Sequence, residues 1–219
     1  MKIIAICAGF VRATALFSAV TLGLTACSSL QPAARPVVYD FGPGALAPVV
    51  ASRQASLPAL VLADVEAPGA LDGTAVLYRL AYSDTQQLRP YALARWSMPP
   101  AQLLRQRMRE QLGQRRTVLN PVQGVSAPGN VMTLHVELEE FSQLFEAADR
   151  SSGLVRLRAT LGEDSAGGEQ LVAQRSFVVQ RPSASADAAG GVRALTVATD
   201  AILQELEQWV QQVEAAPKK

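Results

Sequence analysis

The sequence predicts an α+β fold, a two-layer sandwich in which two amphipathic helices pack on one face of a mostly antiparallel sheet. Several segments alternate apolar and polar residues, which indicates strands with one face in the core and the other in water. Two longer segments, each after a set of strands, place apolar residues at helical spacing. Because these apolar faces must be buried against one another, we expect a single domain over residues 37–214.

The first 26 residues have the features of a lipoprotein signal peptide. The uncharged run from Ala13 to Leu24 follows a basic flank, and at about 12 residues it is too short to cross a membrane as a helix. Leu24-Thr25-Ala26-Cys27 then resembles a lipobox, the bacterial lipoprotein cleavage signal. The resemblance implies a lipid anchor on Cys27. The alternative is an ordinary signal peptide, which would release a soluble protein.

Residues 27–36 are predicted to form a lipidated flexible tether, because they are polar, contain prolines and lack an apolar period. Two or three acyl chains would make release negligible, whereas one chain holds only marginally. Lipoproteins retained in the inner membrane usually carry Asp after the cysteine, so Ser28 indicates the outer membrane, with the domain in the periplasm. Cys7 lies in the removed segment, so the mature chain keeps no thiol for a disulfide or a metal.

The predicted strands are short apolar or alternating runs bounded by turn residues. They are residues 37–41, 57–65, 75–82, 88–96, 132–139, 155–161 and 171–180. Residues 75–82 and 88–96 suggest a hairpin, and Pro90, which lacks an N–H, should lie at an edge or begin that strand irregularly. Glutamates and arginines on neighbouring strands of the later meander could face each other on the solvent side.

Two helices are predicted from caps and apolar stripes. Ser97 is the candidate N-cap of the first, which Gly113 closes; its apolar positions are Ala101, Leu104, Met108 and Leu112. Asp187 could open the second, although Gly190-Gly191 favours a slightly later start. Its stripe comprises Val192, Leu195, Ala198, Ile202, Leu206, Trp209 and Val213.

The chain shows no familiar catalytic pattern: no G-x-S-x-G, P-loop or G-x-G-x-x-G occurs. His135 is the single histidine and shares a strand face with Glu137 and Glu139, but any solvated strand gives such a pattern. We therefore expect no catalytic residues, no metal and no cofactor. A net charge of +1 without a basic block also makes nucleic acid an unexpected partner.

Aromatic and arginine residues cluster on the predicted hairpin. Tyr, Trp and Arg dominate the binding energy of protein interfaces, so the cluster is the candidate partner-binding surface. Its members are Tyr78, Arg79, Tyr82, Tyr91, Arg95 and Trp96. The alternative is that Trp96 and one tyrosine merely pack the hairpin onto the helix. Both explanations stay open for Trp96, whereas Tyr82 and Arg95 fit an interface better.

The segment from Leu77 to Leu112, LYRLAYSDTQQLRPYALARWSMPPAQLLRQRMREQL, resembles the ABC-type transport auxiliary lipoprotein family of the PqiC/YmbA type. The matching features are an aromatic–Arg strand, a short turn, a Tyr-x-x-x-x-Trp strand, and prolines before an amphipathic helix. Here they are Tyr78-Arg79, Asp84, Tyr91 with Trp96, and Pro99-Pro100 leading into Leu103-Leu104.

The resemblance implies a periplasmic α/β domain on an outer-membrane lipid anchor. It also implies a partner, an inner-membrane ABC transporter whose periplasmic component carries MCE domains and moves lipids or other hydrophobic molecules between the membranes. The ATPase supplies the energy, so this subunit needs no chemistry. A homo-oligomeric ring matching a ring-shaped MCE protein is compatible with the resemblance.

Two other functions stay open from the residues alone. The chain could be an outer-membrane assembly or envelope-structure lipoprotein without an ABC partner. It could also be a periplasmic hydrolase, which would require a cavity that holds His135 beside a converging carboxylate.

Overall fold

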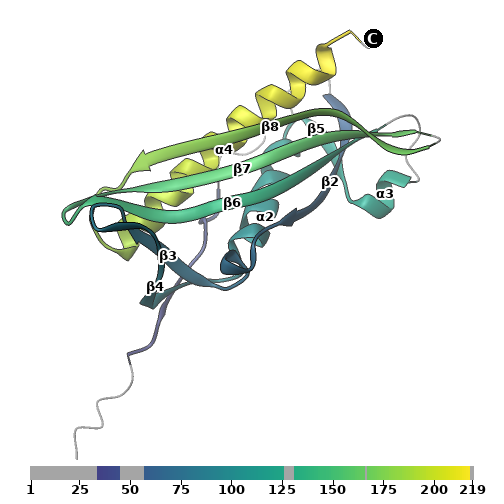
Figure 1. Cartoon of the computed structure of the whole chain (residues 1–219). Helices are drawn as coiled ribbons and strands as arrows, with labels where there is room; N and C mark the ends of the chain where they lie inside the picture. Colours follow the sequence, from purple (N-terminus) through teal and green to yellow (C-terminus); the bar gives the residue numbers. More distant parts are fainter. Residues whose placement is uncertain (1–33, 45–56, 126–130, 166, 218–219) are drawn as a thin grey trace, which may run out of the picture. The chain divides into compact units, whose positions relative to one another are not determined.

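The computed structural model describes residues 34–44, 57–125, 131–165 and 167–217. The predicted signal peptide, Cys27 and nearly all of the predicted tether lie outside these residues. Pro36–Lys219 forms one compact unit, and Arg35 and the residues before it are not part of it. In this unit the described residues build an eight-stranded mixed sheet with a helical layer, which confirms the α+β class (Figure 1).

Strands account for about half of the described residues. They are β1 (Val37–Tyr39), β2 (Leu57–Glu66), β3 (Ala75–Leu80), β4 (Asp84–Trp96), β5 (Arg116–Leu119), β6 (Met132–Ala147), β7 (Arg150–Ser165) and β8 (Gly168–Pro182). The three last strands form the predicted meander; β6 begins where predicted but ends later, and β7 and β8 extend beyond both predicted ends. The turn at Gly167-Gly168 is as expected, and Gly168 has a φ of 109°, which a residue with a Cβ rarely adopts.

The long strand β6 organises the sheet. One of its edges pairs antiparallel with β7, which in turn pairs with β8. Its other edge is shared by two shorter strands: β2 runs parallel to the first half of β6, and β3 runs parallel to its last part, where Tyr78 pairs with Gln143. The β3–β4 hairpin is therefore held at one end of β6, and β1 adds parallel to the end of β4.

The sheet is mixed because long and short strands pair differently. The two longest pairings, β6–β7 and β7–β8, are antiparallel, as predicted. The pairings β1–β4, β2–β5, β2–β6 and β3–β6 are parallel. Alternation in a sequence reports which face of a strand is buried but not the direction of its neighbour, so these parallel pairs could not be predicted.

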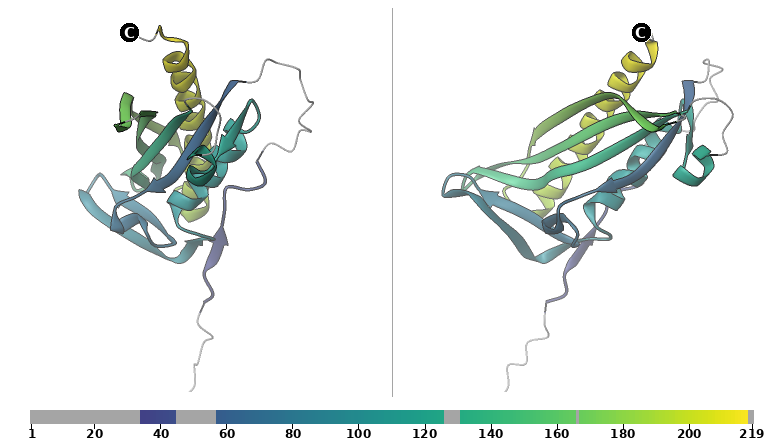
Figure 2. Two further views of the ribbon diagram at one scale, coloured as in Figure 1. Left: turned by 90° about the vertical axis from the view of Figure 1, so that its right-hand side faces the viewer. Right: turned by 45° about the vertical axis from the view of Figure 1, so that its right-hand side comes forward.

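The two long helices, α2 (Pro100–Leu112) and α4 (Ala188–Ala215), pack on one face of the sheet (Figure 2). Helix α4 contacts β6, β7 and β8, while α2 contacts β2 and β5 as well as α4. The predicted apolar stripes enter this layer, with Leu104, Met108, Ile202 and Leu206 all fully buried. Short η1 (Gly69–Leu71) and α3 (Pro121–Val125) lie in connections where no helix was predicted.

Helix α4 begins at Ala188 in spite of its two glycines. The Asp187 carboxylate accepts a hydrogen bond of 2.7 Å from the Gly190 N–H and so caps the helix, which makes the earlier of the two possible starts correct and the later one wrong. A Cβ added to Gly191 would lie 2.1 Å from Gln143 Oε1, and one added to Gly153 would lie 2.5 Å from the Leu195 nitrogen. The glycines therefore allow the helix to approach the sheet closely, which offsets their low helix propensity.

The start of α2 differs from the prediction. Pro99 occupies the N-cap position without a side-chain bond, so Ser97 is not the cap. Instead, the Ser97 N–H donates a 2.7 Å hydrogen bond to the Tyr39 carbonyl and joins the chain after β4 to β1. Pro100 fits the first turn because the N–H it lacks would have no partner inside the helix. Gly113 ends the helix with a φ of −64°, outside the left-handed region.

Candidate docking surface

The hairpin carries all six residues predicted as a partner-binding surface, but the structure gives them different roles. Strand β4 pairs with β3 irregularly, and Pro90 lies opposite Leu77. Strand β1 pairs only with Ala94–Trp96 of β4. Pro90 is therefore at an unshared edge within the described sheet and breaks no ladder with β1, as its missing N–H requires.

Trp96 is a core residue, only 2% exposed. Its ring contacts Phe41 edge-on at a centroid distance of 5.6 Å and Phe141 at 5.5 Å. These contacts join the chain after β1, the end of β4 and the middle of β6. A partner protein could not contact Trp96 without opening this core, so the packing explanation applies to it.

Tyr78 and Tyr91 form a half-buried pair between the hairpin and β6. Their ring centroids are 4.6 Å apart, and Tyr78 also packs edge-on against Phe145. The Tyr91 hydroxyl donates a 2.8 Å hydrogen bond to Gln143 Oε1, whose amide nitrogen donates to Ser151. Burial raises the pKa of the Tyr91 phenol far above its usual value, with smaller contributions from Tyr78 and Asp187. Tyr91 therefore remains a neutral donor that fixes the hairpin to β6.

Arg79 fastens the hairpin turn to β6. Its guanidinium forms a two-point ion pair with Glu140, with Nη2 2.9 Å from Oε2. Its Nη1 donates to the carbonyls of Thr85 and Gln86, both 3.2 Å away. Since both charged side chains are mostly buried and the contact is bidentate, its contribution exceeds that of an ordinary surface pair. Arg79 thus holds the turn rather than offering a free charge to a partner.

Tyr82 is the exposed member of the six, whereas Arg95 is half-buried like Tyr78, Arg79 and Tyr91. Tyr82 lies in the turn after β3 and is 52% exposed. Arg95 is half-buried, and its Nη1 donates to the carbonyls of Tyr91 (2.7 Å) and Ala94 (3.1 Å), which fills acceptors in the irregular part of β4. The sequence placed Tyr78 and Tyr82 on one strand face, but β3 ends at Leu80, so alternation does not extend to Tyr82.

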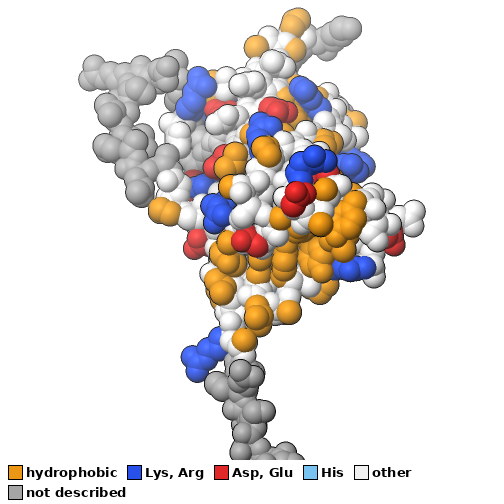
Figure 3. All heavy atoms as spheres, turned by 90° about the vertical axis from the view of Figure 1, so that its left-hand side faces the viewer, with side chains coloured by type: hydrophobic (Ala, Val, Ile, Leu, Met, Phe, Trp, Pro, Cys, Tyr) orange, Lys and Arg blue, Asp and Glu red, His pale blue; other side chains and the backbone are white. Residues whose placement is uncertain are grey.

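Exposed apolar residues adjoin the other end of β4. Val37 and Val38 of β1 are 53% and 63% exposed, and Leu93 of β4 is 48% exposed. Figure 3 shows hydrophobic side chains gathered over this region, next to the point where the described chain begins. From the sequence, Val37 and Val38 are assigned only to a first strand over residues 37–41, because so short a run does not reveal how much of each side chain is covered.

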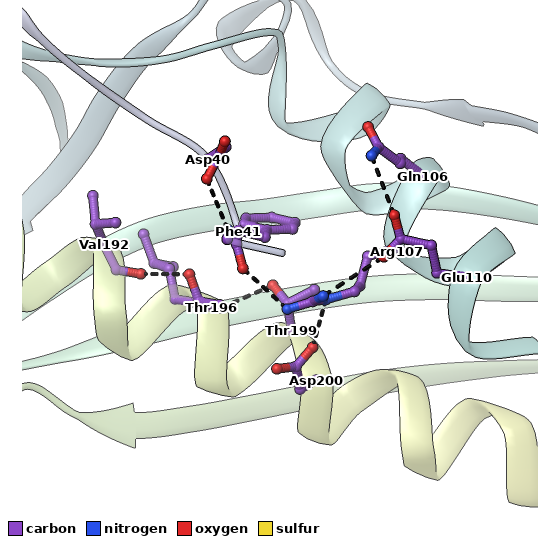
Figure 4. Close-up of polar contacts among 11 residues, drawn as sticks. Asp40, Phe41, Gln106, Arg107, Glu110, Val192, Thr196, Thr199 and Asp200 are labelled. Carbon is purple, nitrogen blue, oxygen red and sulfur yellow. Dashed lines mark hydrogen bonds and ion pairs between the residues drawn. The ribbon is translucent and has the colours of Figure 1, made fainter. Parts of the chain in front are cut away.

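Arg107 is a mostly buried residue that joins α2 to the chain after β1 and to α4, and the sequence patterns did not single it out (Figure 4). From α2 it reaches the Phe41 carbonyl with Nη2 at 3.0 Å, and Asp200 of α4 with Nε at 2.9 Å. Its side chain is 11% exposed, and it borders a hollow of about 250 Å³ beside Asp40. The available signal was its spacing: Arg107 follows the buried Leu103 by one helical turn, so it lies on the flank of the apolar stripe.

His135 lies on the solvent-facing side of β6, where its Nε2 is 2.8 Å from Glu169 Oε1. Both side chains are well exposed, at 45% and 38%. Arg158 of β7 pairs with Glu139 at 2.6 Å and more loosely with Glu137, which is the cross-strand arrangement expected from the sequence. Within the described residues, no three His, Cys, Asp or Glu side chains are grouped as metal ligands.

A family model described as ABC-type transport auxiliary lipoprotein component matches residues 39–207. The chain belongs to this family. The match confirms the resemblance seen in the hairpin. It begins at the last residue of β1 and ends within α4, so it covers nearly all of the elements described above. Membership makes the chain an envelope lipoprotein that assists ABC-type transport. Among the described residues, no helix combines the length and apolar content that a bilayer span requires.

Solved structures resemble this auxiliary lipoprotein in fold. XCC0632 from Xanthomonas campestris aligns with a TM-score of 0.60 and 19% identity, covering 84% of this chain and 90% of its own. An uncharacterized protein aligns with a TM-score of 0.56 and 18% identity, covering 82% and 99%. A search of curated proteins found no match.

Proposed function

We propose that this lipoprotein is a non-enzymatic subunit of an ABC transport system whose periplasmic component carries MCE domains. The system would move lipids or other hydrophobic compounds between the inner and outer membranes. The family match over residues 39–207 carries this proposal, because it covers the hairpin, both long helices and the sheet that joins them. The ATPase would supply the energy, and this subunit would supply position and contacts.

The hairpin turn supports docking of the MCE protein. Tyr82 is exposed there, while the Arg79–Glu140 ion pair keeps the turn fixed to β6. A rigid, exposed aromatic residue loses little conformational entropy on binding and is a common interface hot spot. Arg95, on the same hairpin, is the second residue to test.

Co-purification tests this docking. The lipoprotein should capture the MCE protein from membranes solubilised in mild detergent, and Tyr82→Ala and Arg95→Ala should weaken capture. Leu171→Ala is the matched control, since Leu171 is an apolar residue 68% exposed on β8. Thermal unfolding of each variant separates lost contact from lost fold. If both hairpin variants capture the MCE protein as well as the control does, this docking surface is wrong.

The anchor position is a separate part of the proposal. Ser28 favours the outer membrane, so the mature protein should sediment with outer-membrane markers on a density gradient. Ser28→Asp should move it to the inner-membrane fractions. An unchanged distribution, or a wild-type protein found in the inner membrane, would contradict the outer-membrane assignment.

The absence of catalysis is also testable. His135→Ala removes the one imidazole of the chain at a well-exposed position. We expect the variant to fold normally. Cells that carry it should keep the envelope resistance that depends on transport. A folded His135→Ala protein that captures its partner but fails to support transport would favour the enzymatic alternative.

A further inference from the structure

The apolar side chains of Val37, Val38 and Leu93 lie at one edge of the sheet, which we call the β1 surface. Val38 pairs with Arg95 and so shares a face of the sheet with Leu93, whereas Val37 pairs with Ala94 and lies on the other face of the same edge. All three are about half exposed or more, whereas Ala94 is buried. Strand β1 ends the order of strands in the described sheet, so no further strand of that sheet covers it.

The β1 surface follows the predicted lipid anchor closely in the chain, which keeps it near the membrane. Ten peptide steps separate Cys27 from Val37, so the surface lies within about 36 Å of the anchored cysteine even on a fully extended chain. A tether this short keeps the surface at a high effective concentration next to the bilayer, and a weak contact then becomes well populated.

We propose that the β1 surface rests on the phospholipid headgroups of the membrane that holds the lipid anchor. Val37, Val38 and Leu93 would enter the boundary between headgroups and acyl chains. The contact would orient the domain, because β1 and the C-terminal end of α4 lie at opposite ends of Pro36–Lys219 (Figure 1). The end of α4 would then point away from the bilayer into the periplasm.

This contact leaves the hairpin turn free for another partner. Tyr82 precedes β4, whereas β1 pairs with the last residues of β4. At a rise of about 3.3 Å per residue, a strand of the length of β4 separates its ends by up to about 40 Å. The membrane contact depends on the lipid anchor but not on an MCE partner, so it can be tested without the transporter.

Photo-cross-linking tests the proposal on the full-length lipidated protein. The protein is reconstituted into phosphatidylethanolamine–phosphatidylglycerol vesicles that contain a phospholipid with a diazirine near the start of one acyl chain. After illumination and digestion, labelled peptides are quantified by mass spectrometry. We expect label on the peptides that contain Val37, Val38 and Leu93. Peptides with Leu171 and Val197, which are equally exposed apolar residues on β8 and α4, should carry about tenfold less.

Matched variants complete the test. Val38→Asp with Leu93→Asp should lower the label on β1 and β4 about tenfold. Leu171→Asp with Val197→Asp should leave it unchanged. All four positions are exposed, so both double variants should unfold at the wild-type temperature. The membrane contact is overturned if β1, β4, β8 and α4 are labelled equally. It is also overturned if the label on β1 and β4 persists in the double variant Val38→Asp with Leu93→Asp.

Two further results would replace the bilayer with another occupant. If the β1 double variant turns an oligomer into a monomer in detergent, the surface contacts a second copy of the chain. If it abolishes capture of the MCE protein while lipid labelling persists, the surface binds that protein. If lipid labelling at the β1 surface is found but no MCE protein is captured, only the proposed function fails.

Discussion

Trp96 decides between the two explanations of the aromatic cluster, so its substitution is the most informative single change. Trp96→Ala would empty a site that is 2% exposed and remove two aromatic contacts, with Phe41 and Phe141. Truncation of a buried Phe or Trp to Ala costs about 3–5 kcal/mol. Because domains of this kind are stable by only about 5–15 kcal/mol, about a fifth or more of the stability would be lost.

The assay is denaturant unfolding followed by circular dichroism, because the variant retains only Trp209 as a fluorescent indole. For a chain of this length, a loss of 3–5 kcal/mol also lowers the unfolding temperature by roughly 6–20 °C. Tyr82→Ala is the control from the same hairpin, and its free energy of unfolding should change by no more than about 0.5 kcal/mol.

The two variants should separate stability from docking. We expect Trp96→Ala to lose stability, and Tyr82→Ala to keep stability while losing affinity for the MCE protein. If the free energy of unfolding of Trp96→Ala stays within about 1 kcal/mol of wild type, Trp96 does not hold β1, β4 and β6 together. The division of the hairpin into core and accessible residues would then be wrong.

Three further changes test the helix layer. Gly191→Ala forces its Cβ into the amide that binds the Tyr91 hydroxyl and should cost about 1–3 kcal/mol in denaturant unfolding, whereas Gly73→Ala, with open space around it, should not destabilise. Arg116→Met should cost about 3–5 kcal/mol because it leaves Glu214 buried without its ion pair, and a second change, Glu214→Leu, should recover much of that loss; additive losses would contradict this pairing. Asp187→Ala should cost about 1 kcal/mol at pH 7 through the lost cap. The bond from the Gly190 N–H, aided by Ser185, lowers the pKa of Asp187 in the folded protein below its ordinary value of 3.8, so this stabilisation is present above pH 4 and should be lost as the pH falls through the lowered pKa; a difference from wild type that does not shrink as the pH is lowered below 4 would refute the assignment.

Local patterns were enough to predict the elements of this fold. The apolar stripe of α4 repeats over many turns, and each of its predicted positions from Val192 to Trp209 is buried because helical geometry fixes that spacing. Alternation along β6, β7 and β8 likewise fixed which face is buried. The hairpin between residues 75 and 96 followed from its turn and from the position of Pro90.

The sequence could not predict which strands become neighbours or which side chains they cover. Strands β2 and β3 share one edge of β6, and this parallel pairing depends on chain crossovers rather than on any local pattern. The same pairing brings Glu140 to Arg79 and Gln143 to Tyr91. These partners lie more than 50 residues apart in the chain, so no spacing rule connects them.

By itself, the sequence determined the family, the elements and the cluster of residues on the hairpin, because these depend on residue types at fixed short spacings. Only the tertiary structure decided that Trp96 belongs to the core, that Arg79 is committed to Glu140, and that Val37, Val38 and Leu93 are exposed. The physical reason is that exposure depends on which distant segment packs over a residue, and this is settled by the folded chain as a whole.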